Sequence, residues 1–139
     1  MSSSNVLRLI EEATGINREV LEFAFQPVAK TADYTVTLAD FSKVFTTRGA
    51  GAAVTFTLPA ASNDNKGEWV VFISVANQNM TIAGADEGLV VFNDLTADSI
   101  AYSSSNEKIG GAFLAFSDGT SWIVLPVATE TQTVTISSS

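Results

Sequence analysis

The side chains in this sequence that are best suited to chemistry form a short run of carboxylates and amides. Their oxygens are the hard ligands that Ca²⁺ prefers, but their spacing does not match the ligand positions of an EF-hand loop. Carboxylate pairs can also cleave glycosidic bonds, yet nothing in the sequence holds two of them at a defined separation. We therefore expect acidic turn residues and no metal site. The run consists of Asp86, Glu87, Asn93, Asp94 and Asp98.

The sequence contains no histidine and no cysteine. This excludes Ser-His-Asp catalysis, a thiolate nucleophile, disulfides and thiolate zinc sites. Gly49 to Ala53 begin like a dinucleotide-binding loop, but the third glycine is missing and strand-like residues follow instead of a helix. We therefore expect a β-turn there, and a protein without catalytic residues, cofactor or metal.

The two tryptophans allow a different kind of site. Trp69 and Trp122 could stack on sugars, as aromatic side chains do in glycan-binding proteins. Both lie inside apolar segments that are typical of strands, so we expect them to pack in the core.

The elements that position these residues are short segments rich in Thr, Val, Ile and aromatic residues, separated by turn signals. This pattern predicts an all-β domain over residues 31–139, an antiparallel, jelly-roll-like sandwich or barrel. Asp118-Gly119 is the strongest hairpin signal, and residues 93–98 and 103–106 are expected to be polar loops. The expected strands are Thr35–Leu38, Lys43–Thr47, Val54–Leu58, Glu68–Val75, Met80–Ile82, Leu89–Phe92, Ile109–Phe116, Ser121–Leu125 and Thr133–Ile136.

Residues 1–30 differ from the rest and predict an N-terminal arm, helical or extended. Ser4 can cap a helix whose apolar residues recur at helical spacing, whereas residues 18–24 fit a helix or a strand. The arm's apolar and basic side chains are candidate contacts to a partner, or its apolar ones cover the open end of the β-domain. The candidate partner contacts are Leu7, Arg8, Ile10, Arg18, Leu21, Phe23 and Phe25.

The charge distribution bears on the choice of partner. Only 16% of residues are charged and the net charge is −8. Lys108 is the only basic residue after residue 80, so the last third of the chain is strongly acidic. Such a surface repels nucleic acid and anionic membranes, and we expect neither as a partner.

Two strands are apolar on both of their faces, residues 69–75 and 111–116. A strand of this kind is either buried on both sides or lies at a contact between subunits. We expect a symmetric contact between copies of the chain. The candidate interface residues are Val70, Phe72, Phe113 and Ala115.

The first residues carry neither the cationic segment nor the long apolar segment of a signal peptide. No apolar run approaches the length of about 18 residues that spans a bilayer. The expectation is a chain made and folded in a cytoplasm.

The order of strands and turns between residues 32 and 125 is specific enough to compare with a known class of protein. The segments concerned are Ala32–Asp40, Phe45, Gly49-Ala50, Val54–Pro59, Gly67, Thr81–Gly84, Ile109–Gly111 and Asp118–Trp122. This succession resembles the head-decoration (cement) proteins of tailed bacteriophages and related modules of their tail fibres.

The resemblance implies a homotrimeric virion protein that is made in the host cytoplasm and sits on the capsid surface. It would bind the major capsid protein of the assembled head and stabilise it, with the arm as anchor. The alternative is a tail-fibre or spike module that binds a host surface glycan. The loops at residues 62–67, 93–98 and 103–106 contain no aromatic residue, which counts against that alternative.

Overall fold

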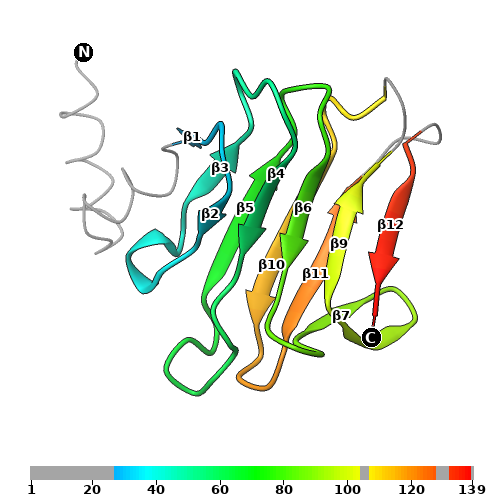
Figure 1. Cartoon of the computed structure of the whole chain (residues 1–139). Coiled ribbons are helices and arrows are strands. Elements are labelled where there is room, and N and C mark those ends of the chain that lie inside the picture. Colours follow the sequence, from blue (N-terminus) through cyan, green and yellow to red (C-terminus); the bar gives the residue numbers. More distant parts are fainter. Residues whose placement is uncertain (1–26, 104–106, 128–131, 139) are drawn as a thin grey trace, which may run out of the picture.

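The structure is a computed structural model that describes residues 27–103, 107–127 and 132–138. In these ranges the chain forms two β-sheets packed face to face, with one short 3₁₀ helix, η1 (Leu38–Asp40) (Figure 1). The prediction of an all-β sandwich is confirmed.

One sheet has seven strands and the other has five. In spatial order, the seven are β1 (Pro27–Ala29), β3 (Val44–Thr46), β5 (Trp69–Ile73), β10 (Ala112–Ser117), β11 (Trp122–Val127), β7 (Leu89–Val91) and β8 (Asp94–Ala97). The five are β12 (Val134–Ser137), β9 (Ser99–Tyr102), β6 (Met80–Ala83), β4 (Val54–Thr57) and β2 (Tyr34–Thr35). Because β1 belongs to the larger sheet, the sandwich begins inside the segment that the sequence assigns to the arm.

The first half of the described chain winds between the two sheets. Successive strands from β1 to β6 alternate sheets, so each returns to its own sheet in the same direction as before. Strands β1, β3 and β5 are therefore parallel, as are β2, β4 and β6. The expected antiparallel, jelly-roll-like arrangement is wrong in this respect, because both sheets are mixed.

Antiparallel pairing dominates the second half, where tight turns join β7 to β8 and β10 to β11. The hairpin expected at Asp118-Gly119 is confirmed and joins β10 to β11. The Asp118 carboxylate accepts the N–H groups of Thr120 and Ser121, both at 2.8 Å, and Gly119 takes the positive φ of +92° that the turn requires. These two hydrogen bonds lower the pKa of Asp118 below its ordinary value.

The prediction of a polar loop at residues 93–98 is wrong. Residues 94–97 form β8, which pairs with β7 at the edge of the seven-stranded sheet. An edge strand with a single buried residue, Ala97, leaves no apolar alternation for the sequence to show.

The core lies between the sheets and contains a chain of aromatic contacts. Phe56 packs on Phe72 with ring centroids 4.8 Å apart, and Phe45 contacts both. Trp122 is fully buried, as expected, and its Nε1–H donates to the carbonyl oxygen of Pro59 at 2.6 Å. Packing of the two sheets removes nearly every large inward-facing apolar residue from water. This burial supplies most of the free energy that favours folding.

Tyr102 connects the two sheets at one end of the core. It lies on β9, and its hydroxyl oxygen is 2.8 Å from the carbonyl of Ala112 and 2.5 Å from that of Val127. The same oxygen accepts the Ala112 N–H at 3.2 Å. Burial raises the pKa of the Tyr102 phenol more than these hydrogen bonds lower it, so the group stays neutral near pH 7.

A second polar link holds the segment between β2 and β3. The Asp40 carboxylate accepts the Tyr34 hydroxyl at 2.7 Å and the Thr37 N–H at 2.9 Å, with Lys43 Nζ at 3.8 Å. Burial raises the pKa of Asp40, but these hydrogen bonds and the lysine outweigh it and lower the pKa below its ordinary value. The expected strand 35–38 thus stops early, and η1 with its Asp40 cap takes its place.

Candidate interaction surface

The outward side chains of the seven-stranded sheet form three rows that cross its central strands. Side chains alternate along a strand, so residues that flank a core residue point to solvent. Strand pairing aligns these outward residues into rows, which we call together the apolar face. The rows are Trp69, Phe116, Ile123 and Val90; Val44, Val71, Leu114 and Leu125; and Thr46, Ile73, Ala112 and Val127.

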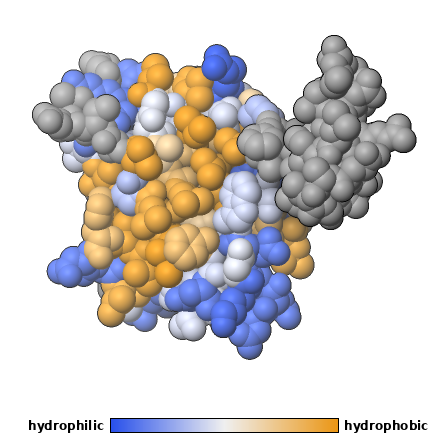
Figure 2. Space-filling model, turned by 180° about the vertical axis from the view of Figure 1, so that it is seen from behind, coloured by the Kyte–Doolittle hydropathy of each residue, from blue (hydrophilic) through white to orange (hydrophobic). Residues whose placement is uncertain are grey.

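No position in these three rows carries a charge, and Thr46 is the only polar one. In Figure 1 the five-stranded sheet faces the viewer, and Figure 2 shows the molecule from the opposite side. That side has a continuous hydrophobic area edged by hydrophilic residues. Some of its side chains are well exposed, with 48% of Leu125 and 63% of Val127 accessible. The apolar face is therefore a contiguous patch rather than scattered apolar residues.

The dimensions of the apolar face follow from sheet geometry. The central strands β5, β10 and β11 have five or six residues, which corresponds to a length of about 17–20 Å. Five neighbouring strands at about 4.8 Å spacing span roughly 20 Å. The apolar face thus covers roughly 400 Å², the size of the largest apolar patch on a typical monomer, and such a patch is often functional.

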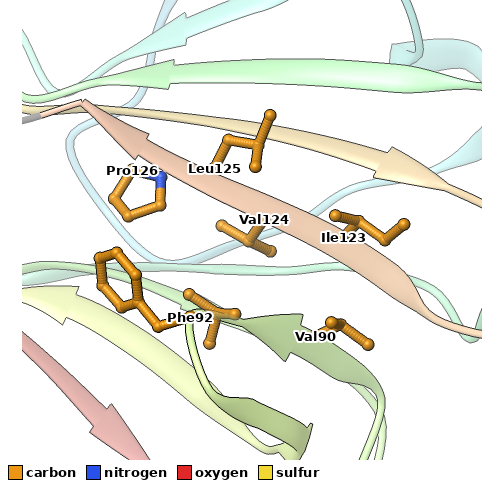
Figure 3. Close-up of a pocket in the computed structure, with 7 residues that line it drawn as sticks. Val90, Phe92, Ile123, Val124, Leu125 and Pro126 are labelled. Atoms are coloured by element: carbon orange, nitrogen blue, oxygen red, sulfur yellow. The ribbon is translucent and has the colours of Figure 1, made fainter.

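At one side of the apolar face the sheet opens into a groove. Strands β7 and β11 are paired only at Leu89–Trp122 and Val90–Ile123, and they diverge beyond those pairs. The resulting cavity has a volume of about 350 Å³. Its lining is Val90, Val91, Phe92, Ile123, Val124, Leu125 and Pro126 (Figure 3).

Phe92 forms the outer wall of the groove near Pro126 (Figure 3). Its backbone has a φ of +50°, in the left-handed region that bulky residues rarely adopt, and its side chain is 70% exposed. A large apolar side chain is therefore exposed at a position whose backbone conformation is itself unfavourable. Positions of this kind are common at functional sites.

Pro126 removes a backbone N–H donor from the edge of β11 that borders the groove. The Trp122 N–H donates to the carbonyl oxygen of Gly88, just before β7, so alternate residues of β11 turn their backbone groups toward β7. Pro126 is one of these residues, and it has no N–H. The groove edge of β11 therefore lacks a donor where an added strand would need one.

The five-stranded sheet presents a very different outward face, which we call the hydroxyl face. It contains only Thr, Ser and Ala, aligned in two rows by the strand pairing. The rows are Thr55, Thr81, Ala101 and Thr135; and Thr35, Thr57, Ala83, Ser99 and Ser137.

The structure corrects the interface residues that the sequence predicts. Val70, Phe72, Phe113 and Ala115 have no exposed surface and face the core of their own chain. A fully buried side chain cannot contact a second subunit, so these four do not form an interface. The residues between them, such as Val71 and Leu114, point outward instead.

Among the other candidates, Trp69 is not in the core as expected but half-buried on the apolar face. A turn forms at Gly49, where φ is +85° and the Ala50 N–H donates to Thr47, as the sequence predicts. The candidate arm contacts lie outside the described residues: Leu7, Arg8, Ile10, Arg18, Leu21, Phe23 and Phe25.

Two carboxylates of the acidic run accept hydrogen bonds from nearby backbone groups. Asp98 accepts the Glu87 N–H at 2.8 Å, and Asp94 accepts the Thr96 N–H at 2.9 Å. In the described part of the chain, acidic side chains do not gather into a group of three that could hold a metal ion. Within the same ranges, no helix has the length and hydropathy needed to cross a bilayer.

Comparison with protein-family models finds no match to this sequence. Comparison with curated proteins finds no similar sequence. The apolar face and its groove are therefore the features from which function is inferred.

Proposed function

We propose that this protein is a structural protein that works by association, as a homotrimeric decoration protein of an assembled phage head. Copies contact one another through the apolar face, and the trimer binds the major capsid protein at the capsid surface. The observation that supports this proposal is the apolar face itself, which is contiguous and free of charge.

Charge favours this face as the contact between copies. Each chain carries a net charge of −8, so two copies repel one another least when they meet at a face without charges. The three rows of the apolar face meet that condition. Nucleic acid and anionic membranes gain nothing from such a surface, and the proposal includes neither.

The energetics favour an interface that extends beyond the apolar face. Burying roughly 400 Å² of apolar surface yields about 10 kcal/mol per copy at ~25 cal/mol/Å². Association costs about 4–15 kcal/mol in lost freedom. The gain from burial and the cost of association are of similar size. The apolar face therefore serves as the centre of an interface whose surrounding residues supply the remaining free energy of association.

Head stabilisation would follow from linkage. A subunit that binds the assembled lattice and not its separated parts shifts the equilibrium toward the assembled shell. Repetition by capsid symmetry multiplies a modest affinity at each position. This role needs no catalysis and no cofactor, in keeping with a sequence that has no histidine or cysteine.

Two measurements test the proposal. Light scattering of the full chain should give the mass of a trimer, whereas a monomer at micromolar concentration would contradict it. Cosedimentation should then show binding to heads of the phage that encodes the chain and none to dissociated capsid protein.

The arm is tested separately as the anchor. The double variant Leu21→Ser and Phe23→Ser should remain trimeric and lose binding to heads. If the variant binds heads as well as the parent chain does, the arm is not the anchor.

The alternative is a fibre module that binds a glycan, and one observation favours it. Trp69 is partly accessible and could stack on a sugar ring. Its neighbours across the sheet, Phe116 and Ile123, offer no side-chain hydrogen bonds for sugar hydroxyls. Clear hits on a glycan array, lost in Trp69→Ala, would favour this alternative.

A further inference from the structure

We infer that the groove between β7 and β11 receives an apolar side chain from a second copy of this chain. The inference rests on the proposed association and assigns a specific role to one part of the apolar face. In this view the flat rows supply contact area, and the groove sets how the neighbouring copy is positioned.

The chemistry of the groove favours a side chain over an added strand. Every residue that lines it is apolar, and its volume of about 350 Å³ accommodates one or two large side chains. An added strand would need backbone donors along β11, but Pro126 offers none. Insertion of a side chain needs only apolar walls, which Phe92 and Leu125 extend outward.

Charge and continuity favour a second copy as the occupant. Val90, Ile123 and Leu125 belong both to the groove and to the apolar face, so whatever covers one reaches the other. In a trimer each copy meets two neighbours, so the copy that fills the groove covers only part of the apolar face and must present an uncharged apolar surface beside the side chain that it inserts. Another copy of this chain carries such a surface.

Single cysteines test the groove cleanly, because the chain has no cysteine of its own. Leu125→Cys places a thiol at the groove, and Thr57→Cys places a matched control on the hydroxyl face. The reaction rate of each thiol with a disulfide reagent is measured over a range of protein concentration, with light scattering on the same samples.

The expected result is a thiol at residue 125 that reacts at least about tenfold more slowly than the control where the protein is assembled. The difference should disappear on dilution to the monomer. If the thiol at residue 125 reacts as fast as the control in the assembled protein, both the groove and the apolar face are open, because Leu125 belongs to both. If residue 125 is protected but a thiol at Phe92, which lines the groove and lies outside the three rows, reacts as fast as the control, the groove is open and the inference fails, while the proposed association stands.

Two other outcomes also decide the matter. Protection that persists in the monomer means that the chain's own segment covers the groove, which overturns the second copy as occupant. A protein that is monomeric at every concentration overturns both this inference and the proposed function.

A second variant guards against a substitution that itself weakens assembly. If Leu125→Cys alone fails to assemble while Thr57→Cys assembles, the leucine is needed for the contact, and Phe92→Cys then reports the protection of the groove from its opposite wall. Rapid labelling of Phe92→Cys in the assembled protein would contradict the inference in the same way.

Discussion

The two faces of the sandwich cover the same core, and along the strands of both faces side chains alternate between core and solvent. The two faces nevertheless expose different kinds of side chains. The middle strand of the larger sheet, β10, presents Ala112, Leu114 and Phe116. The middle strand of the smaller sheet, β6, presents Thr81 and Ala83. Threonine packs well on a pleated sheet and remains hydrated through its hydroxyl group, whereas leucine and phenylalanine do not.

This difference shows that a low content of charge does not by itself indicate association. The hydroxyl face is as poor in charge as the apolar face, but its side chains hydrogen-bond to water and need no partner. Only the apolar face gains free energy when it is covered. The asymmetry between the faces therefore points to one side of the molecule as the side that associates.

The largest expected effect is that of a charge at the centre of the apolar face. In Leu114→Asp the carboxylate would be buried without a partner at the interface, at a cost of about 3–5 kcal/mol. Association should weaken by roughly 10²- to 10⁴-fold, measured by sedimentation, while circular dichroism shows the same β-structure.

The matched control is Thr81→Asp, at the middle of the smaller sheet. It should leave association nearly unchanged, because the hydroxyl face stays in water. Equal loss of association in the two variants would mean that net charge, and not the apolar face, controls assembly.

A smaller effect is expected where the two sheets are joined. A Cβ added in Gly111→Ala would lie 2.8 Å from the Tyr102 ring, which cannot move without losing its hydrogen bonds to Ala112 and Val127. Overpacking of this kind should lower the free energy of unfolding by about 2–3 kcal/mol, measured by urea denaturation. Gly51→Ala, where a Cβ meets nothing within 4 Å, should change it little and serves as the control.

Asp40 should make stability depend on pH in the acidic range. Its pKa is lowered in the folded chain, so its contribution is present above its ordinary pKa of 3.8 and is lost as the pH falls through the folded value. Asp40→Asn should cost about 1–2 kcal/mol at neutral pH, because the amide replaces a charged hydrogen-bond acceptor. Urea denaturation from pH 7 to pH 2 should show a shallower loss of stability in the variant than in the parent chain. Parallel curves would assign the acid sensitivity to other groups.

The smallest effect on stability is expected when the hydroxyl face is made apolar. The triple variant Thr55→Val, Thr57→Val and Thr81→Val should change the free energy of unfolding by less than about 0.5 kcal/mol per site. The new apolar patch should, however, produce species larger than those of the parent chain in light scattering. Unchanged mass would show that an apolar face alone does not lead to association in this fold.

Much of the fold was predictable from local signals. The Asp118-Gly119 turn and the alternating segment Val54–Leu58 correspond to a hairpin and to β4 in the structure. Strand β8 was missed because it lies at an edge and buries only Ala97. Parallel pairing was missed because it depends on which sheet each strand enters, which no local pattern records.

The candidate site was predicted as a class of surface but not as a set of residues. Strand β5 is apolar at every position from Trp69 to Ile73, so alternation cannot tell which of its faces points to the core. The sequence predicts Val70 and Phe72 at the interface, whereas in the structure Trp69, Val71 and Ile73 face outward. The groove depends on two strands, β7 and β11, that diverge after two paired residues, and residue types alone carry no signal of such a divergence.

The amino-acid sequence by itself determined that this chain forms β-sheets, that it has no histidine and no cysteine and that it has more apolar strand surface than one core needs. Only the tertiary structure decided on which face of the sandwich this additional apolar surface lies. The reason is physical: a strand repeats every two residues, so a shift of one residue exchanges its faces, and only packing against the second sheet selects which face is buried.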